Sequence, residues 1–326
     1  MSKLIGIEID DECLRLAQLD GTEIKSVVRR LPEDLVVNDE IVSFETLAKL
    51  IKEVKKEAKI SGRDCAIIMP ENSAYFRTIN MPPVSVAQLK LNLPYEFRDF
   101  VGNDSLNYNF DYAVDSLETD ENGKCVNMHL FAAAGSKKTI ESYIQLLKKA
   151  HLKLKTALPR EMAIMNLVKS FPNSAETEVC LVDVGYSGTI VYIVSGGKIA
   201  ATKTIDIGCR NIDDVISATK GIDVYLAASY RETDYDGCLS DGMCDDIYDR
   251  IAREVLMAIN FYRYENPESE LQQITFVGNG APIQPLTERI CSTVSLEQAN
   301  VAEFLPGRSA EEENLPRTAL ALGVAL

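Results

Sequence analysis

Short apolar runs separated by polar turns open the chain and return in its second half. In the first half they occupy residues 4–9, 13–19 and 23–29. In the second half they occupy residues 179–182, 190–194 and 198–207. Runs of this length that are rich in Val and Ile and joined by short turns are typical of antiparallel strands. The pattern therefore predicts one strand meander in each half of the chain.

Helical periodicity surrounds both meanders. Apolar residues that recur every three or four positions predict helices. The predicted helices cover residues 44–58, 86–100, 137–147, 159–168, 245–264 and 283–290. Residues 211–246 are polar with little strand signal, residues 292–296 are predicted as a strand, and residues 315–326 fit either a helix or a strand. Helices and strands thus alternate, which predicts the α/β class.

Residues 74–156 have a pattern of their own. Predicted strands at residues 74–80, 106–114, 125–134 and 152–156 enclose two predicted helices. This order, β-α-β-β-α-β, is that of a ferredoxin-like unit. Pro94 lies inside the first of its helices and is expected to kink or split it, because proline removes a backbone donor.

Composition narrows the function classes. The chain has 326 residues, a formal charge of −15, and 46 % hydrophobic and 25 % charged residues. The acidic balance argues against a nucleic-acid partner, which needs clustered Lys and Arg. The N-terminal sequence does not look like a signal peptide, and no apolar stretch reaches the ~18 residues of a membrane span. Eight scattered cysteines indicate reduced thiols of a cytosolic protein, and two histidines outside any motif give no sign of a hydrolase.

Three turns combine glycine with an acid or an amide. The first follows residues 6–9 and ends at Asp10, the second runs from Asp183 through Gly185 to Thr189, and the third covers residues 277–281. Glycine lets a backbone approach a phosphate closely, and the N–H and hydroxyl groups of such turns can bind phosphate oxygens. An ordinary hairpin explains the second turn equally well. No Walker A sequence is present, and the third turn lacks the last glycine of a Rossmann fingerprint.

In this order the elements resemble the actin-like ATPase superfamily. The closer resemblance is to the PilM family of type IV pilus assembly proteins, which are relatives of the division protein FtsA, and it covers nearly the whole chain. It is carried by LIGIEI at 4–9, RTINMPPVSVAQLKLNLPYEF at 77–97, LFAAAGSKKTIESYIQLLKKAHLKLKTALPREMAIMNLV at 130–168, VDVGYSGT at 182–189, REVLMAINFYRYEN at 253–266 and FVGNGAPIQPL at 276–286.

The resemblance implies an actin-like, two-lobed, ribonuclease H-like α/β fold with an inserted ferredoxin-like subdomain. The first lobe would combine residues 1–73, 157–176 and 315–326. The inserted subdomain would cover residues 74–156. The second lobe would cover residues 177–314, with a small part of its own at about 209–246.

The resemblance also implies ATP between the lobes. Asp183 would lie near Mg²⁺ and its water, as the candidate catalytic residue and the one candidate metal contact. Phosphate and nucleoside would be held by the backbone and side chains of Gly185, Ser187, Gly188, Thr189, Gly278, Asn279 and Gly280. The family acts chiefly as a cytoplasmic scaffold, peripheral at the inner membrane. It binds the short N-terminal tail of a PilN-like membrane protein and so couples the membrane platform to the assembly motors. The crevice near residues 77–97 and 157–168 is the candidate surface for that tail.

The first turn departs from the family pattern. The family reads like D-x-G-x-x-x-x-K, where this chain has Glu8, Asp10 and Arg15. Asp10 replaces the glycine that should face the phosphates. A carboxylate ~5 Å from one phosphate charge costs about 3 kcal/mol at an effective dielectric near 20, or roughly 100-fold in affinity. The hypothesis is therefore a scaffold with weak or absent nucleotide binding, rather than an enzyme. The alternatives are an ATPase whose nucleotide state gates partner binding and an FtsA-like filament former that assembles with copies of itself.

Two charged segments remain. The acidic loop at residues 234–246 does not have the spacing of a calcium loop and is interpreted as a solvated loop. Lys52, Lys55, Lys56 and Lys59 lie on the polar side of the first predicted helix and its end, at residues 44–60. A solvated helix face is the default interpretation of these lysines, and a membrane-surface patch is the alternative.

Overall fold

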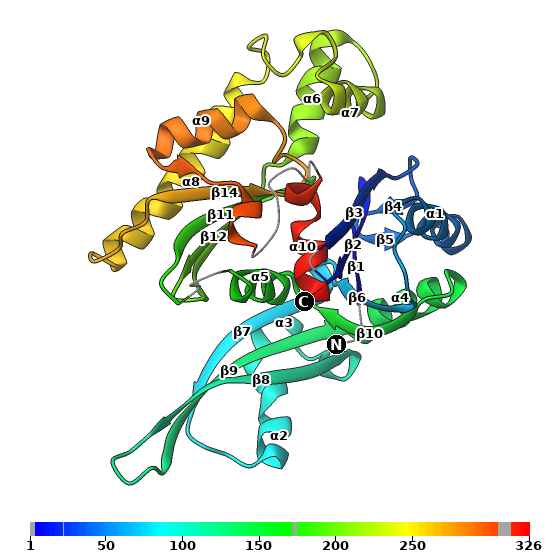
Figure 1. Ribbon diagram of the computed structural model, residues 1–326. Helices are drawn as coiled ribbons and strands as arrows, with labels where there is room; N and C mark the ends of the chain where they lie inside the picture. The colour runs from blue at the N-terminus through cyan, green and yellow to red at the C-terminus, as the bar shows by residue number, and fades with distance from the viewer. Residues whose placement is uncertain (1–3, 22, 172–174, 306–313) are drawn as a thin grey trace.

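The computed structural model describes residues 4–21, 23–171, 175–305 and 314–326. The remaining parts of the predicted ranges, at residues 1–3, 22, 172–174 and 306–313, lie outside the described residues. Two lobes, each built on a sheet, stand beside one another, and an elongated third unit extends from them (Figure 1).

The first sheet has five strands in the order β10-β6-β1-β2-β3. Their bounds are β1 Ile5–Ile9, β2 Cys13–Asp20, β3 Glu23–Arg30, β6 Asp64–Ile68 and β10 Lys153–Leu158. Two helices, α1 (Phe44–Glu57) and α4 (Lys137–Lys149), share a core with the odd-numbered residues of β1 on one face of this sheet. A small hairpin, β4 (Val36–Val37) with β5 (Glu40–Ile41), lies beside α1 (Figure 1).

The second sheet has the order β13-β12-β11-β14-β15. Its strands are β11 Glu178–Val184, β12 Thr189–Ser195, β13 Lys198–Ile205, β14 Gln273–Val277 and β15 Glu297–Gln298. The helices that share a core with it are α6 Cys209–Lys220, α7 Val224–Thr233, α8 Asp245–Glu265 and α9 Gln284–Val294. Both meanders predicted from the sequence are present, each as three antiparallel strands.

Two helices fill the space between the sheets. Helix α5 (Arg160–Lys169) and helix α10 (Leu315–Ala325) share one core with residues of both sheets, among them Ala17 and Leu181. Helix α10 lies so close to β1 that a Cβ on Gly6 would be 1.6 Å from the backbone oxygen of Ala321. The last segment of the chain, which fitted a helix or a strand, is therefore a helix packed against the first strand.

The third unit has a three-stranded sheet in the order β7-β9-β8. Its elements are β7 Ala74–Met81, α2 Val86–Glu96, α3 Arg98–Val101, β8 Tyr108–Thr119 and β9 Cys125–Ser136. Its core is separate from the others and contains Ile79, Leu93 and Phe97. Pro94 stays within α2. The helix ends shortly after it, and Phe97 separates α2 from α3.

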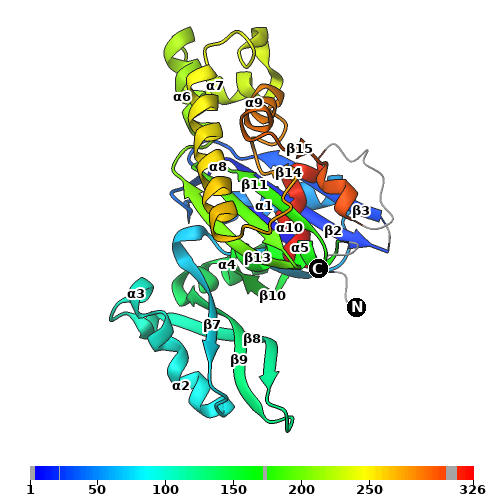
Figure 2. The same ribbon diagram turned by 90° about the vertical axis from the view of Figure 1, so that its left-hand side faces the viewer.

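The last helix and strand predicted for this unit lie elsewhere. Strand β10 pairs in parallel with β6 of the first sheet, and Leu147 of α4 is buried in that lobe's core. The order β-α-β-β-α-β is thus present along the chain, but the three-stranded sheet ends at Ser136 and does not extend to residue 156. Figure 2 shows β7, β8 and β9 apart from β10. Strand pairing depends on contacts that are distant in sequence, and β10 pairs as the edge strand of the first sheet, where its apolar side chains are half-buried.

Two shorter segments also differ from prediction. The stretch at 211–246, predicted as irregular, contains α6, α7 and the start of α8, and its buried positions Ile212 and Ile216 have helical spacing. The strand predicted at 292–296 is the last turn of α9, which ends where Ser295 turns to φ 55°, followed by the short β15. Polar side chains on the exposed faces hid the helical pattern at 211–246, whereas the alternation of buried Val294 and Leu296 with exposed Ser295 resembles a strand.

Candidate functional site

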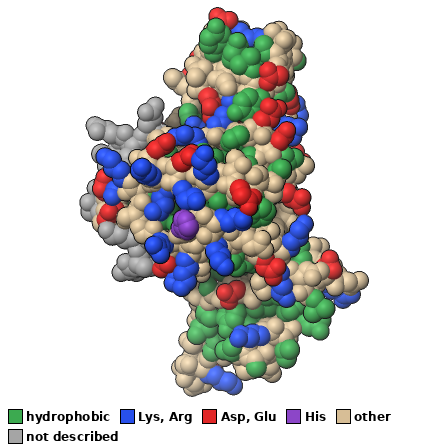
Figure 3. All heavy atoms as spheres, turned by 90° about the vertical axis from the view of Figure 1, so that its right-hand side faces the viewer, with side chains coloured by type: hydrophobic (Ala, Val, Ile, Leu, Met, Phe, Trp, Pro, Cys, Tyr) green, Lys and Arg blue, Asp and Glu red, His purple; other side chains and the backbone are tan. Residues whose placement is uncertain are grey.

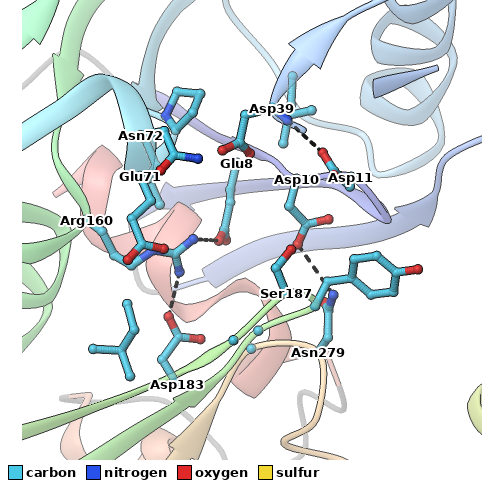
Figure 4. A pocket seen from close by; sticks show the side chains of 18 of the residues that line it. Glu8, Asp10, Asp11, Asp39, Glu71, Asn72, Arg160, Asp183, Ser187 and Asn279 are labelled. Carbon is cyan, nitrogen blue, oxygen red and sulfur yellow. Dashed lines mark hydrogen bonds and ion pairs between the residues drawn. The ribbon is translucent and has the colours of Figure 1, made fainter. Parts of the chain in front are cut away.

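A pocket of about 300 Å³ lies where the two hairpin turns approach one another. Nine of the residues predicted for the site line it: Glu8, Asp10, Arg15, Asp183, Gly185, Ser187, Gly188, Gly278 and Asn279. Thr189 and Gly280 are not among the lining residues. The Thr189 hydroxyl is buried and donates to the carbonyl oxygen of Ile207 at 2.7 Å. The structure thus brings the three predicted turns together around one space (Figure 4).

Asp10 faces its own turn. One carboxylate oxygen accepts hydrogen bonds from the N–H of Glu12 at 2.8 Å and of Cys13 at 2.6 Å. The other accepts from Arg15 Nη2 at 2.9 Å. Burial acts to raise the pKa of Asp10, but the Arg15 charge and the two backbone donors together lower it. Asp10 is therefore a charged cap of the β1–β2 turn, and Arg15 is already paired with it.

Arg160 occupies the centre of the pocket, and sequence reasoning did not select it. Its Nη1 donates to Asp183 Oδ2 at 2.5 Å, and its Nη2 lies 3.3 Å from Glu8 Oε1. Figure 4 shows its guanidinium between these two carboxylates, one from each hairpin. Burial works against its charge, but Asp183 and then Glu8 raise the pKa of Arg160 well above its ordinary value. The available signal was an arginine directly after Pro159, at the first position of a helix whose middle is apolar.

A second buried network lies behind the pocket. Asn279 Nδ2 donates to Glu12 Oε2 at 2.7 Å, and its amide oxygen accepts from Arg15. Arg231 on α7 contacts Glu12 and donates to Asp213 on α6 at 2.7 Å. Burial raises the pKa of Asp213 to about 6, although Arg231 acts in the opposite direction. The first hairpin is in this way tied to the β14 turn and to α6 and α7 of the second lobe.

The glycines of the third turn serve close packing. Gly278 has φ 88°, and a Cβ there would lie 2.4 Å from Asp183 Oδ1. A Cβ on Gly280 would lie 2.3 Å from Val184 Cγ1. Both positions press against β11, so the lack of a side chain is explained by the contact between β14 and β11. Glycine in this turn is therefore required by the fold, whatever the pocket binds.

The charges of the pocket suit a triphosphate poorly. Its lining contains six carboxylates, from Glu8, Asp10, Asp11, Asp39, Glu71 and Asp183, against three arginines, Arg15, Arg160 and Arg210. Arg15 and Arg160 are already paired with acids of the lining. Burial and the nearby Asp11 and Asp10 raise the pKa of Asp39 to about 6. In the described part of the chain no group of three or more His, Cys, Asp or Glu side chains is arranged to hold a metal ion.

Asp183 Oδ1 is a polar atom in the pocket wall that could still take a ligand. Within the described residues it is buried without a hydrogen-bond partner, as are Arg15 Nε and Nη1. These orphaned atoms leave polar capacity at the pocket wall. The other oxygen of the Asp183 carboxylate, Oδ2, is bound to Arg160, so Mg²⁺ and a triphosphate would have to share Asp183 with the guanidinium or displace it.

Comparison with known proteins identifies the fold. The family model described as type IV pilus assembly protein PilM matches residues 6–326. A solved PilM-PilN type IV pilus biogenesis complex is similar at a TM-score of 0.80 and 19 % identity, over 99 % of this chain and 97 % of that chain. The ethanolamine utilization protein EutJ from Carboxydothermus hydrogenoformans is similar at a TM-score of 0.60 and 15 % identity, over 100 % and 90 %. No curated protein matches the sequence significantly. The expected actin-like two-lobed fold is confirmed.

Proposed function

The chain belongs to the family of type IV pilus assembly proteins PilM, and from this membership we propose that it is an adaptor that binds the N-terminal tail of a PilN-like membrane protein. The observation that carries the proposal is the family match over residues 6–326, together with a fold shared along nearly the whole chain with a PilM solved in complex with PilN. No helix among the described residues combines the length and the apolar character needed to cross a membrane. We place the adaptor on the cytoplasmic side of the inner membrane, held there by its partner.

A groove of about 320 Å³ between the third unit and the first lobe is the proposed site for the tail. Ile140, Ile144 and Leu154 give it an apolar floor, with Asp111 and Lys155 at its rim. Strand β10 pairs only with β6 among the described strands, so its other edge is free. An extended peptide can add to such an edge with main-chain hydrogen bonds while its apolar side chains enter the groove. Of the crevice expected near residues 77–97 and 157–168, this groove includes Ala157 and Pro159 but no residue of 77–97.

Substitution in the groove tests this placement. The side chain of Ile144 is 47 % exposed, and a charged side chain there would be desolvated by an apolar peptide. We expect Ile144→Glu to weaken binding of a fluorescent tail peptide at least ~10-fold, which corresponds to about 1.4 kcal/mol. Val126→Glu, at a position 48 % exposed but outside the groove, is the matched control and should bind like wild type. Equal affinities for all three proteins would contradict the placement.

A deletion tests the third unit as a whole. Ala74 and Gly135 are paired across β7 and β9, so a short Gly-Ser linker can join Ser73 to Ser136. A longer deletion, through residue 155, would also remove α4 from the core of the first lobe. We expect the short deletion to unfold cooperatively in urea and to lose capture of the tail peptide. Undiminished capture would exclude the third unit from the binding site.

We propose that nucleotide binding is weak. Fold neighbours of the actin-like type suggest nucleotide binding in general, but the pocket of this chain has an excess of carboxylates and an arginine already bound to Asp183. Isothermal titration of ATP with Mg²⁺ is expected to give no micromolar binding. A micromolar dissociation constant would show that Arg160 yields to the ligand and would favour the alternative function.

That alternative is a nucleotide-gated adaptor, and one observation favours it. Met69 lines both the central pocket and the groove, and Pro159 in the groove directly precedes Arg160 in the pocket. A ligand that moved Arg160 would therefore disturb the groove wall. The two functions are separated by measuring tail affinity with and without ATP, and again in Asp183→Ala. Filament formation is tested by sedimentation with and without nucleotide, and contacts with other platform or motor proteins remain a prediction.

A further inference from the structure

A basic surface lies where α1 and α4 end side by side. We define the lysine cluster as Lys52, Lys55, Lys56 and Lys59 together with Arg63. These residues line a hollow of about 470 Å³ whose lining also includes His151 and contains no carboxylate. Figure 3 shows Lys and Arg side chains gathered around a histidine on this face. The proposed adaptor function does not use this surface.

Helix ends alone do not account for so many cations. Helix α1 closes with a hydrogen bond from the Ile60 N–H to the Lys55 carbonyl oxygen at 3.1 Å, and α4 closes with one from Leu152 to Leu147 at 2.8 Å. A helix C-terminus carries roughly half a negative charge, so two of them attract about one cation. Five cationic side chains line the hollow. Most of the positive charge is therefore in excess of what the two helices need.

The acids of the same helix are paired away from the cluster. Glu57 contacts Arg29 of β3, Glu53 pairs with Lys49 at 3.8 Å, and Glu45 pairs with Lys149 at 2.5 Å. In the described part of the chain, none of the five residues of the lysine cluster has an ion pair. The whole chain has a formal net charge of −15, so the positive potential is local to this face. Screening confines its reach to about 10 Å, so it favours a ligand that touches the face directly.

We propose that the lysine cluster docks on the anionic headgroups of a bilayer. The choice of a bilayer rests on the proposed function, which brings the protein to a membrane protein's tail. Helix α4 joins the two surfaces, because its Ile140 and Ile144 line the groove and the residues after its end line the basic hollow. Its 13 residues span about 20 Å, so a tail held in the groove keeps the cluster close to the membrane from which the tail comes.

A bilayer fits this surface better than a nucleic acid does. Anionic lipids diffuse laterally and can gather beneath a compact patch, so five cations at two helix ends are enough. A nucleic acid presents a continuous line of phosphates and needs an extended basic track. The formal charge of −15 for the whole chain also opposes a polyanion that extends beyond the hollow.

The size of the effect follows from the number of charges. Each basic residue at an anionic surface strengthens binding roughly fivefold at moderate salt. Neutralising the four lysines as Lys52→Gln, Lys55→Gln, Lys56→Gln and Lys59→Gln should therefore weaken vesicle binding more than ~100-fold. The matched control neutralises four exposed lysines outside the hollow, as Lys90→Gln, Lys124→Gln, Lys198→Gln and Lys203→Gln, with the same change in net charge.

Co-sedimentation of the full chain with vesicles tests the proposal. Wild type and the control variant should pellet with mixed phosphatidylcholine–phosphatidylglycerol vesicles, less so as salt rises, and not with pure phosphatidylcholine. The lysine-cluster variant should stay in the supernatant while keeping the wild-type circular dichroism spectrum. Equal pelleting of the cluster variant, binding to neutral vesicles, or binding of duplex DNA in preference to anionic vesicles would each overturn the proposal.

Tail binding in solution separates this inference from the proposed function. The cluster variant is expected to bind the tail peptide with wild-type affinity, because its substitutions lie outside the groove. Loss of vesicle binding with tail binding intact in this variant supports the membrane surface. If the wild-type chain binds the tail but no anionic vesicle, the membrane inference fails and the adaptor function stands. If it binds vesicles but no tail, the adaptor function fails instead.

Discussion

The ion pairs of Arg160 offer the most direct test of the pocket. Its guanidinium contacts Asp183 of the second lobe and Glu8 of the first, and the side chains of these two acids are only 3 % and 6 % exposed. Arg160→Met keeps much of the side-chain length but removes the charge. Two buried carboxylates then face one another without the cation that separates them.

The loss of unfolding free energy expected for Arg160→Met can be estimated from the geometry. At 2.5 Å the Coulomb attraction between Arg160 and Asp183 is about 6–7 kcal/mol at an effective dielectric of ~20. Desolvation of the three groups offsets part of this, and removing one partner of a buried pair usually costs about 3–5 kcal/mol. We therefore expect Arg160→Met to lower the unfolding free energy by about 3–5 kcal/mol at neutral pH. Arg210→Met is the control, since Arg210 lines the same pocket but is exposed, and should cost less than ~0.5 kcal/mol.

Urea unfolding followed by circular dichroism measures these differences. A double-mutant cycle with Asp183→Asn isolates the pair, and we expect the double variant to be more stable than additivity predicts by about 2–3 kcal/mol. Burial raises the pKa of Glu8 even in the presence of Arg15 and Arg160. Without Arg160 this pKa must rise further, so the deficit of Arg160→Met should shrink as pH falls and Glu8 takes up a proton. Additive single effects with no pH dependence would refute the assigned ion pairs.

Two further predictions concern the fold and its pH dependence. Gly6→Ala should prevent folding or lower the unfolding free energy by more than ~4 kcal/mol, because its Cβ would overlap the backbone oxygen of Ala321. Gly135→Ala is the control: its Cβ would make ordinary contacts, so the melting temperature should shift little. Asp39→Asn should raise the unfolding free energy by about 1–3 kcal/mol above roughly pH 7, since burial raises the pKa of Asp39 to about 6 and its charged form is disfavoured in the folded state. This gain should vanish towards pH 4, where Asp39 is protonated in the folded state as well. If the unfolding free energy gained by Asp39→Asn persisted or grew in acid, the pKa of Asp39 would not be raised by folding.

The sequence predicted the parts of the fold that depend on local order. Both meanders follow from short apolar runs with polar turns, and the acids at the turns of the two hairpins line one pocket, as the likeness of the hairpins predicts. The pairing of β10 with β6 could not be read in this way, because an apolar strand carries no mark of the sheet that it joins. Helices α6 and α7 were missed for a different reason, since their exposed faces are polar enough to resemble a loop.

The chemistry of the pocket was predictable by residue type but not by partner. Asp10 was expected to face phosphates, yet its oxygens are taken by two backbone N–H groups and by Arg15. Arg160 is distant in sequence from Glu8 and Asp183, and only the packing of α5 between the two sheets brings the three together. Sequence pattern thus selected residues that line one pocket, while the ion pairs between them depend on tertiary packing.

The position of Arg160 also limits how the pocket and the groove can act on one another. Strand β10 ends at Leu158, Pro159 lines the groove, and Arg160 begins α5 inside the pocket. Proline fixes its own φ, so the chain has little freedom at this joint to absorb a displacement of the Arg160 backbone. If nucleotide affects tail binding, Arg160→Met should therefore change tail affinity without any nucleotide, and by a similar factor to that which saturating ATP produces in wild type. An ATP effect on tail affinity that persists unchanged in Arg160→Met would require a different route between the two sites.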